Sequence, residues 1–91
     1  MAKPTQPKTA QRSPERFTPL QGQYLAFIHA SCKIHRRSPS EADLQHYFGV
    51  SPPSVHRMVV TVAARGLLRR TPGQARSIEL IIAPVDLPLL R

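Results

Sequence analysis

The stretch of sequence that decides the fold is residues 49–70, GVSPPSVHRMVVTVAARGLLRR. Ser51 is a residue type favoured at a helix N-cap, and the two prolines after it fit a first helical turn, whose N–H groups have no partner within the helix. Apolar residues then recur at helical spacing up to Gly66: Val55, Met58, Val59 and Val62. The pattern predicts an amphipathic helix that buries these four and turns other faces outward, carrying Ser54, His56, Arg57, Thr61 and Arg65.

A shorter helix is predicted immediately before this stretch. Ser40 can cap it, Asp43 stands at the capping-box position, and Gly49 can end it in the left-handed conformation. The residues expected to hold the two helices together are Leu44, Phe48, Val50, Val55 and Met58. Two capped helices joined by a tight glycine turn form a helix-turn-helix.

A first helix is predicted over residues 19–32. Thr18 is its N-cap, Pro19 its first residue, and Gln21 completes a capping box. One apolar stripe follows at helical spacing: Leu20, Tyr24, Phe27 and Ile28, with Cys32 on the same side. We interpret Cys32 as a small residue at the edge of the core rather than as a reactive thiol.

The residues after Gly66 predict a β-hairpin. Residues 67–71 and 76–82 flank Pro72-Gly73-Gln74, which fits a type II turn, and Ile78 and Leu80 alternate with polar neighbours. The fold class is therefore mainly α with a small β-hairpin, a three-helix winged helix-turn-helix over residues 17–82. Residues 1–16 are expected to be a disordered basic arm, and residues 83–91 an apolar, proline-containing tail that is strand-like or loose.

The length and the amino-acid composition of the chain exclude several classes of function. The 91 residues carry 13 Lys+Arg against 5 Asp+Glu, a net charge of +8, so a polyanion is the expected partner.

A chain this short leaves little room for a deep catalytic pocket, and we expect no enzyme activity and no cofactor. Cys32 and His35 make only half of a zinc site, so no metal is expected either. The lone cysteine and the lack of a signal peptide or membrane-length apolar run point to the cytoplasm, with no membrane contact.

Several motifs occur in a telling order: Thr18-Pro19 with Gln21 and Gln23, Ser38-Pro39-Ser40, Gly49-Val50-Ser51, Ser54-Val55-His56, residues 65–70 (RGLLRR), Pro72-Gly73 and residues 76–80 (RSIEL). This series resembles the N-terminal DNA-binding domain of the LexA repressor family. The resemblance implies a transcriptional repressor that binds double-stranded DNA with its third helix in the major groove. LexA proteins continue into a self-cleaving protease domain, and we expect this chain to lack autoproteolysis.

The residues expected on the DNA follow from this resemblance and from the charge pattern. On the third helix they are Ser51, Pro53, Ser54, His56, Arg57 and Thr61; on the wing and the backbone-facing connection they are Arg36, Arg37, Arg69, Arg70 and Arg76. Arg57 is the candidate for direct reading of guanine. His56 reads a base or binds a phosphate, and Ser51 and Ser54 are caps, contacts or both. The chain departs from the family pattern at Arg36 and Gln45, where small residues are usual.

Two further possibilities stay open. Winged domains also serve as protein-binding adaptors, and the apolar C-terminal residues offer a surface for a partner. The same tail, or a two-fold operator, would allow a homodimer. Arginines gathered on one face with the third helix would favour DNA binding, whereas scattered arginines would favour the adaptor.

Overall fold

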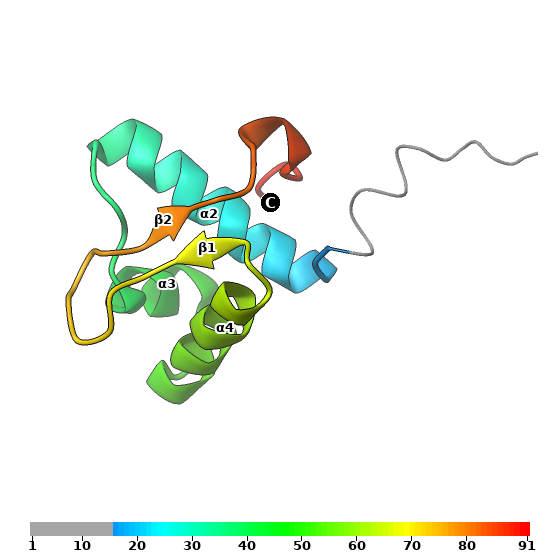
Figure 1. The fold of residues 1–91 in the computed structure, drawn as a ribbon. Helices are drawn as coiled ribbons and strands as arrows, with labels where there is room; N and C mark the ends of the chain where they lie inside the picture. The colour runs from blue at the N-terminus through cyan, green and yellow to red at the C-terminus, as the bar shows by residue number, and fades with distance from the viewer. Residues whose placement is uncertain (1–15) are drawn as a thin grey trace, which may run out of the picture.

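The computed structural model describes residues 16–91. Its elements, in chain order, are α2 (Pro19–His35), α3 (Glu41–Phe48), α4 (Pro52–Ala64), β1 (Leu68–Arg69), β2 (Glu79–Leu80) and the 3-10 turn η1 (Pro84–Asp86). Figure 1 shows the hairpin lying beside the three helices, with its turn projecting away from them. The predicted three-helix winged helix-turn-helix is confirmed. The predicted arm, apart from Arg16, lies outside the described residues.

Helix α2 begins at the predicted residue, Pro19, and its C-terminal end, His35, lies three residues beyond the predicted end at residue 32. The Thr18 side chain accepts a hydrogen bond from the Gln21 N–H at 3.1 Å, and the Gln21 side chain accepts one from the Thr18 N–H at 3.0 Å. The helix ends at Arg36, whose φ of 60° is left-handed and whose N–H donates to the Cys32 carbonyl. Glycine is the residue that adopts this conformation without steric cost, so Arg36 occupies a position that suits glycine.

The buried side of α2 differs in part from the predicted stripe. Tyr24 and Ile28 are buried as expected, together with Leu25, but Leu20 is 50% exposed. Gln23, one turn along the helix from Leu20, is buried and binds the C-terminal segment: its Nε2 donates to the Leu89 carbonyl and its Oε1 accepts from the Arg91 N–H. The prediction that Leu20 belongs to the buried stripe was wrong, and the contacts of Gln23, which reach across 66 residues, are invisible to local periodicity.

Helices α3 and α4 form the helix-turn-helix. Ser40 and Asp43 exchange the two hydrogen bonds of a capping box, each at 3.0 Å, and Gly49 ends α3 with a φ of 66°. Both N–H groups of Gly49 and Val50 donate to the Gln45 carbonyl, which closes the turn. The backbone carbonyl of Gln45 thus forms part of the turn. The Gln45 side chain, which is longer than the small residue expected at this position, is half-buried.

The core lies where the three helices meet the base of the hairpin. Its members are Phe17, Tyr24, Leu25, Ile28, Leu44, Val55, Val59, Val62, Leu67, Leu68, Ile78 and Ile82. Val55, Val59 and Val62 are each at most 1% exposed, so the inward face predicted for the third helix is confirmed. Burial of a valine side chain stabilises a fold by about 1.5 kcal/mol or more, which offsets the weak helix propensity of β-branched residues. The core therefore fixes which face of α4 looks outward.

The paired strands of the hairpin are shorter than predicted. Leu68 pairs with Leu80 and Arg69 with Glu79, and the expected turn closes with a hydrogen bond from the Gln74 N–H to the Thr71 carbonyl. Between the turn and the strands, the Ser77 hydroxyl exchanges two hydrogen bonds with the Thr71 backbone, and Arg76 has a φ of 55°. A left-handed residue cannot continue a strand, so the ladder stops before Arg76. We call residues 68–80 the wing.

The C-terminal segment corrects the expectation of a strand-like or loose tail. Residues 84–86 form the turn η1, and the chain then folds back along α2, held by the two hydrogen bonds to Gln23 and by one from the Tyr47 hydroxyl to the Arg91 carbonyl. Gly22 permits this close packing because a Cβ there would lie 2.9 Å from the Phe17 ring and 3.0 Å from Pro88. The proline-containing segment that the sequence analysis expected to interrupt regular structure forms the turn at which the chain reverses direction.

Candidate nucleic-acid interface

The outward face of α4 carries the side chains that the sequence analysis assigned to it. Ser51, Pro53, His56, Arg57 and Thr61 are exposed, and Ser54 is half-buried. Because the valine stripe is fixed in the core, these residues lie on the outward side of the helix, which also carries the exposed Val60. Within residues 16–91, no hydrogen bond or ion pair ties the Arg57 guanidinium to another residue. Its charge is available to a ligand in solvent.

The N-terminal turn of α4 is organised by two serines. The Ser51 side chain accepts a hydrogen bond from the Ser54 N–H at 3.3 Å, so it acts as the N-cap. Its own hydroxyl donates to the Ser54 hydroxyl oxygen at 3.0 Å. The Ser54 hydroxyl hydrogen is then free to reach outward. The structure therefore makes Ser51 a cap and leaves Ser54 able to donate.

His56 is held by an acidic residue that the sequence analysis did not assign to the site. Its Nδ1 lies 3.3 Å from both carboxylate oxygens of Glu41, at the start of α3. An ionised carboxylate only accepts hydrogen bonds, so Nδ1 carries the hydrogen in this contact. Nε2 is the ring nitrogen left for a ligand. The two residues are fifteen positions apart on different helices, and nothing in the local sequence signals the contact.

A groove separates α4 from the wing and brings three of the predicted residues together. Its volume is about 310 Å³, and its lining includes His56, Arg70 and Arg76. The other walls come from the α3 N-terminus and the turn of the wing: Pro39, Ser40, Glu41, Thr71, Gly73, Gln74, Ala75, Ser77 and Ile78. Glu41 is the one acidic residue among these walls. The groove therefore brings two arginines and one histidine together against the single carboxylate of Glu41.

Arg76 has a structural partner as well as a place in this groove. Its Nη1 donates to Asp43 Oδ2 at 3.0 Å and to the Ser38 carbonyl at 3.2 Å. The Ser38 hydroxyl donates in turn to the Ile78 carbonyl. These contacts fasten the wing to the connection between α2 and α3, and we call residues Ser38, Asp43 and Arg76 the wing latch.

The latch keeps Asp43 ionised. A hydrogen bond from the Ser40 backbone lowers the pKa of Asp43 below its usual value; burial raises it, and the Ser40 hydroxyl and the Arg76 guanidinium lower it again. The net direction is downward, so the carboxylate persists at neutral pH. Arg76 thus faces a permanent negative charge, and only part of its own charge is left for an external anion.

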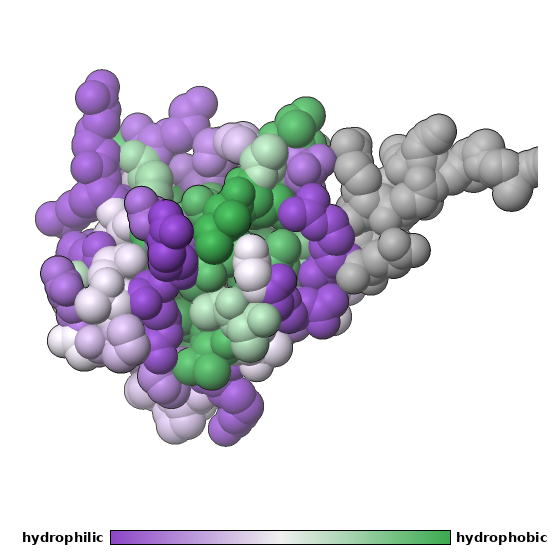
Figure 2. Space-filling model, in the orientation of Figure 1, coloured by the Kyte–Doolittle hydropathy of each residue, from purple (hydrophilic) through white to green (hydrophobic). Residues whose placement is uncertain are grey.

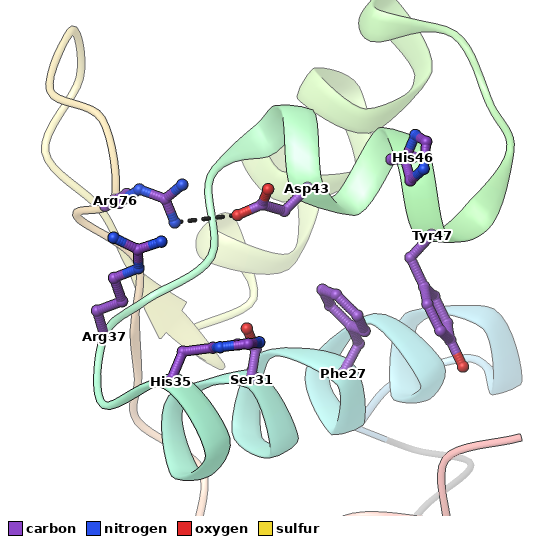
Figure 3. A pocket seen from close by; sticks show the side chains of 8 residues that line it. All are labelled: Phe27, Ser31, His35, Arg37, Asp43, His46, Tyr47 and Arg76. Atoms are coloured by element: carbon purple, nitrogen blue, oxygen red, sulfur yellow. Dashed lines mark hydrogen bonds and ion pairs between the residues drawn. The ribbon is translucent and has the colours of Figure 1, made fainter.

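The remaining predicted arginines are distributed over neighbouring surfaces. Arg69 is paired with Glu79 at 3.0 Å and lies with Val60, Ala64 and Ile81 on the side of the hairpin away from the groove. Figure 2 shows an apolar area over the hairpin, bordered by hydrophilic residues. Arg36 and Arg37 lie where α2 joins α3, and Arg37 lines a second cleft together with Arg76 (Figure 3). The wing thus contributes Arg70 and Arg76 to the groove, and not Arg69.

Residues 16–91 contain neither a cluster of metal ligands nor a helix that could cross a membrane. No three potential metal ligands among the His, Cys, Asp and Glu side chains of this part of the chain come together. None of its helices combines the length and the hydropathy that a bilayer-spanning segment needs.

Comparison with known proteins gives two kinds of match. Residues 35–72 match the family model of the IclR helix-turn-helix domain. The chain is also 31% identical over 74 residues to a LexA repressor of Magnetococcus marinus, an alignment that covers 81% of this chain and 32% of the relative. It is 33% identical over 71 residues to a LexA repressor of Zymomonas mobilis, covering 77% of this chain and 33% of that protein. The chain spans about a third of the length of these curated relatives.

Proposed function

We propose that this chain, whose described residues form a LexA-like winged helix-turn-helix domain, binds specific sequences in double-stranded DNA and represses transcription as a non-enzymatic regulator. The observation that carries the proposal is the outward face of α4, exposed from Ser51 to Thr61 beside a groove lined by His56, Arg70 and Arg76. A helix of this kind fits the major groove, which is about 12 Å wide. The phosphate backbone would then lie in the groove between α4 and the wing.

The side chains divide into two roles in this proposal. Arg57 reads a guanine edge, because it is exposed on α4 and has two parallel donors for O6 and N7. His56, Ser54 and Thr61 face the same major groove. Ser51 and Pro53 form the start of α4 and position this first turn next to the DNA. Arg70 and Arg76 neutralise phosphates from the wing, and Arg36 and Arg37 do so from the connection before α3. Arg69 has a smaller part, since Glu79 already neutralises it.

Binding to a random pool of duplexes, followed by sequencing of the bound fraction, tests the proposal directly. We expect one enriched motif, and a mirrored pair of motifs about one helical turn apart if two copies bind together. Affinity for the selected duplex should fall steeply between about 50 and 200 mM salt, with a log–log slope of about 0.9 per neutralised phosphate. No enrichment together with salt-independent binding would contradict the proposal and favour a protein-binding adaptor.

Paired alanine variants test the two roles. Arg57→Ala should relax the preference at one base pair and cost about 1–3 kcal/mol on the selected duplex. Arg70→Ala should weaken binding to selected and random duplexes alike and reduce the salt slope by about one. Fluorescence anisotropy with both duplexes measures each effect. Equal losses on both duplexes for both variants would remove the assignment of Arg57 to base reading.

A further inference from the structure

A second cleft, of about 370 Å³, lies between α2 and α3 and is separate from the outward face of α4. We call it the α2–α3 cleft. Its lining comes from four parts of the chain: α2, Arg37 in the connection between α2 and α3, the start and end of α3, and Arg76 of the wing. Figure 3 shows the two guanidinium groups of Arg37 and Arg76 at one end and the rings of Phe27 and Tyr47 toward the other. The volume lies within the range of small-molecule sites, about 300–1,000 Å³.

The ring end of the cleft offers an aromatic wall. The Phe27 and Tyr47 rings have centroids 4.5 Å apart and planes tilted by 31°. Tyr47 is 45% exposed although its ring packs on two phenylalanines, so one side of this aromatic cluster is uncovered. An aromatic body placed here would gain the offset or edge-on contacts that rings prefer.

The opposite end of the cleft is cationic. Arg76 shares its charge with Asp43, but no ion pair or hydrogen bond joins the Arg37 side chain to another residue of the described chain. His35 and His46 add ring nitrogens along the walls. Since Asp43 is committed to the wing latch, the excess positive charge falls on Arg37. Its planar guanidinium can hold a carboxylate or phosphate through two parallel hydrogen bonds.

Ser31 supplies an independent sign of a ligand. It lines the cleft from the C-terminal part of α2, it is only 9% exposed, and its hydroxyl has no hydrogen-bond partner among the described residues. Buried polar groups in proteins are almost always paired, so an unpaired hydroxyl needs an explanation. In Figure 3 its oxygen points from α2 into the space between the cationic and aromatic ends. A bound molecule that spans the cleft would pass this hydroxyl.

We propose that the α2–α3 cleft binds a small aromatic anion, with its carboxylate or phosphate on Arg37, its ring on Phe27 and Tyr47, and a polar atom on Ser31. The anionic group and the aromatic ring of the ligand are both needed for binding, because neither end of the cleft alone encloses a ligand. The cleft lies apart from the outward face of α4, but it shares Arg37 and Arg76 with the phosphate contacts proposed above, so its occupancy is tested in the absence of DNA.

NMR titration of the full chain without DNA tests the proposal. The probes are benzoate and phenyl phosphate, which share the ring and differ in the anion; acetate, inorganic phosphate and benzyl alcohol each lack one of the two features. We expect benzoate or phenyl phosphate to give saturable shifts at Phe27, Ser31, Arg37 and Tyr47. The stronger of the two identifies the anion. The probes that lack the ring or the charge should bind at least about tenfold more weakly, which corresponds to about 1.4 kcal/mol.

Three variants make the test specific. Arg37→Gln and Ser31→Ala should weaken the better probe, by about tenfold for the arginine because a charge-assisted contact is lost. Lys33→Gln removes the same charge from an exposed residue of α2 that does not line the cleft, and it should leave the probe affinity unchanged. Thermal unfolding checks that each variant is folded. Unsaturable shifts, equal binding of acetate and benzoate, or equal losses in Arg37→Gln and Lys33→Gln would overturn the site, and DNA binding would be untouched by that result.

Discussion

Removal of the Asp43 side chain should loosen the attachment of the wing and lower the stability of the whole domain. In Asp43→Ala, the Ser40 N–H loses its acceptor and Arg76 loses its ion pair. The first loss should cost about 1 kcal/mol, the typical net value of a hydrogen bond, because the partial exposure of Asp43 removes the extra strength that a buried charged acceptor would have. The ion pair adds about 0.5 kcal/mol, since its two side chains are 37% and 43% exposed. The sum of about 1.5 kcal/mol corresponds to a melting temperature lower by about 6–12 °C.

The pH dependence of this loss follows from the pKa of Asp43. Its pKa is lowered in the folded protein, chiefly by the hydrogen bond from the Ser40 backbone. A carboxylate with a lowered pKa contributes stability that is fully present above its unfolded pKa of about 3.9 and disappears as the pH falls through the folded value. The difference between the natural protein and Asp43→Ala should therefore be the same at about pH 7 and pH 5, and should shrink below about pH 4.

Urea or thermal unfolding across this pH series measures both effects. Glu79→Ala is the matched control, because it also removes a carboxylate that pairs with an arginine of the wing, but this pair is about two-thirds exposed. It should change stability by at most about 0.5 kcal/mol. The reasoning would be refuted if Asp43→Ala were no more destabilising than Glu79→Ala, or if its effect were undiminished in acid.

Three substitutions probe the backbone and the core. Arg36→Gly should stabilise the protein by about 1 kcal/mol, because glycine tolerates the left-handed conformation that Arg36 adopts; unchanged urea unfolding would contradict this. Gly49→Ala should destabilise it by about 1 kcal/mol for the same reason, although no atom lies within 4 Å of the added Cβ, and a neutral result would argue against a strain-based account. Val59→Ala should cost about 2 kcal/mol in the same assay, since Val59 is 1% exposed; a cost below about 0.5 kcal/mol would mean that α4 does not bury this face.

The helices and the turns could be predicted from the sequence because their signals are local. Thr18, Ser40 and Ser51 each cap the helix that follows, and Gly49 and Gly73 take the left-handed conformations that the turns require. These features depend on residues at most a few positions apart. The predicted apolar face of α4 holds for the same reason, since helical spacing alone puts the valines on one side.

Long-range contacts account for what the sequence did not indicate. Gln23 binds the backbone of Leu89 across 66 residues, and the left-handed conformation of Arg76 lies beyond the end of the short strand pairing. Glu41 reaches His56 across fifteen residues, and Asp43 reaches Arg76 across thirty-three. Such pairs follow from tertiary packing, for which a single sequence carries no periodic signal. The arginines of the wing looked alike in sequence, but their roles differ because each meets a different neighbour.

The wing latch links the stability of the fold to the geometry of the proposed DNA surface. Asp43 both caps α3 and holds Arg76, so the helix that precedes the helix-turn-helix turn also fixes the base of the wing. The Ser38 hydroxyl adds a second tie to the Ile78 carbonyl, in the segment between Arg76 and β2. Regular pairing between β1 and β2 covers only two residue pairs, which would leave the wing free to swing if these ties were absent. Precise placement of Arg70 beside α4 therefore depends on side-chain contacts at the α3 N-terminus more than on the sheet itself.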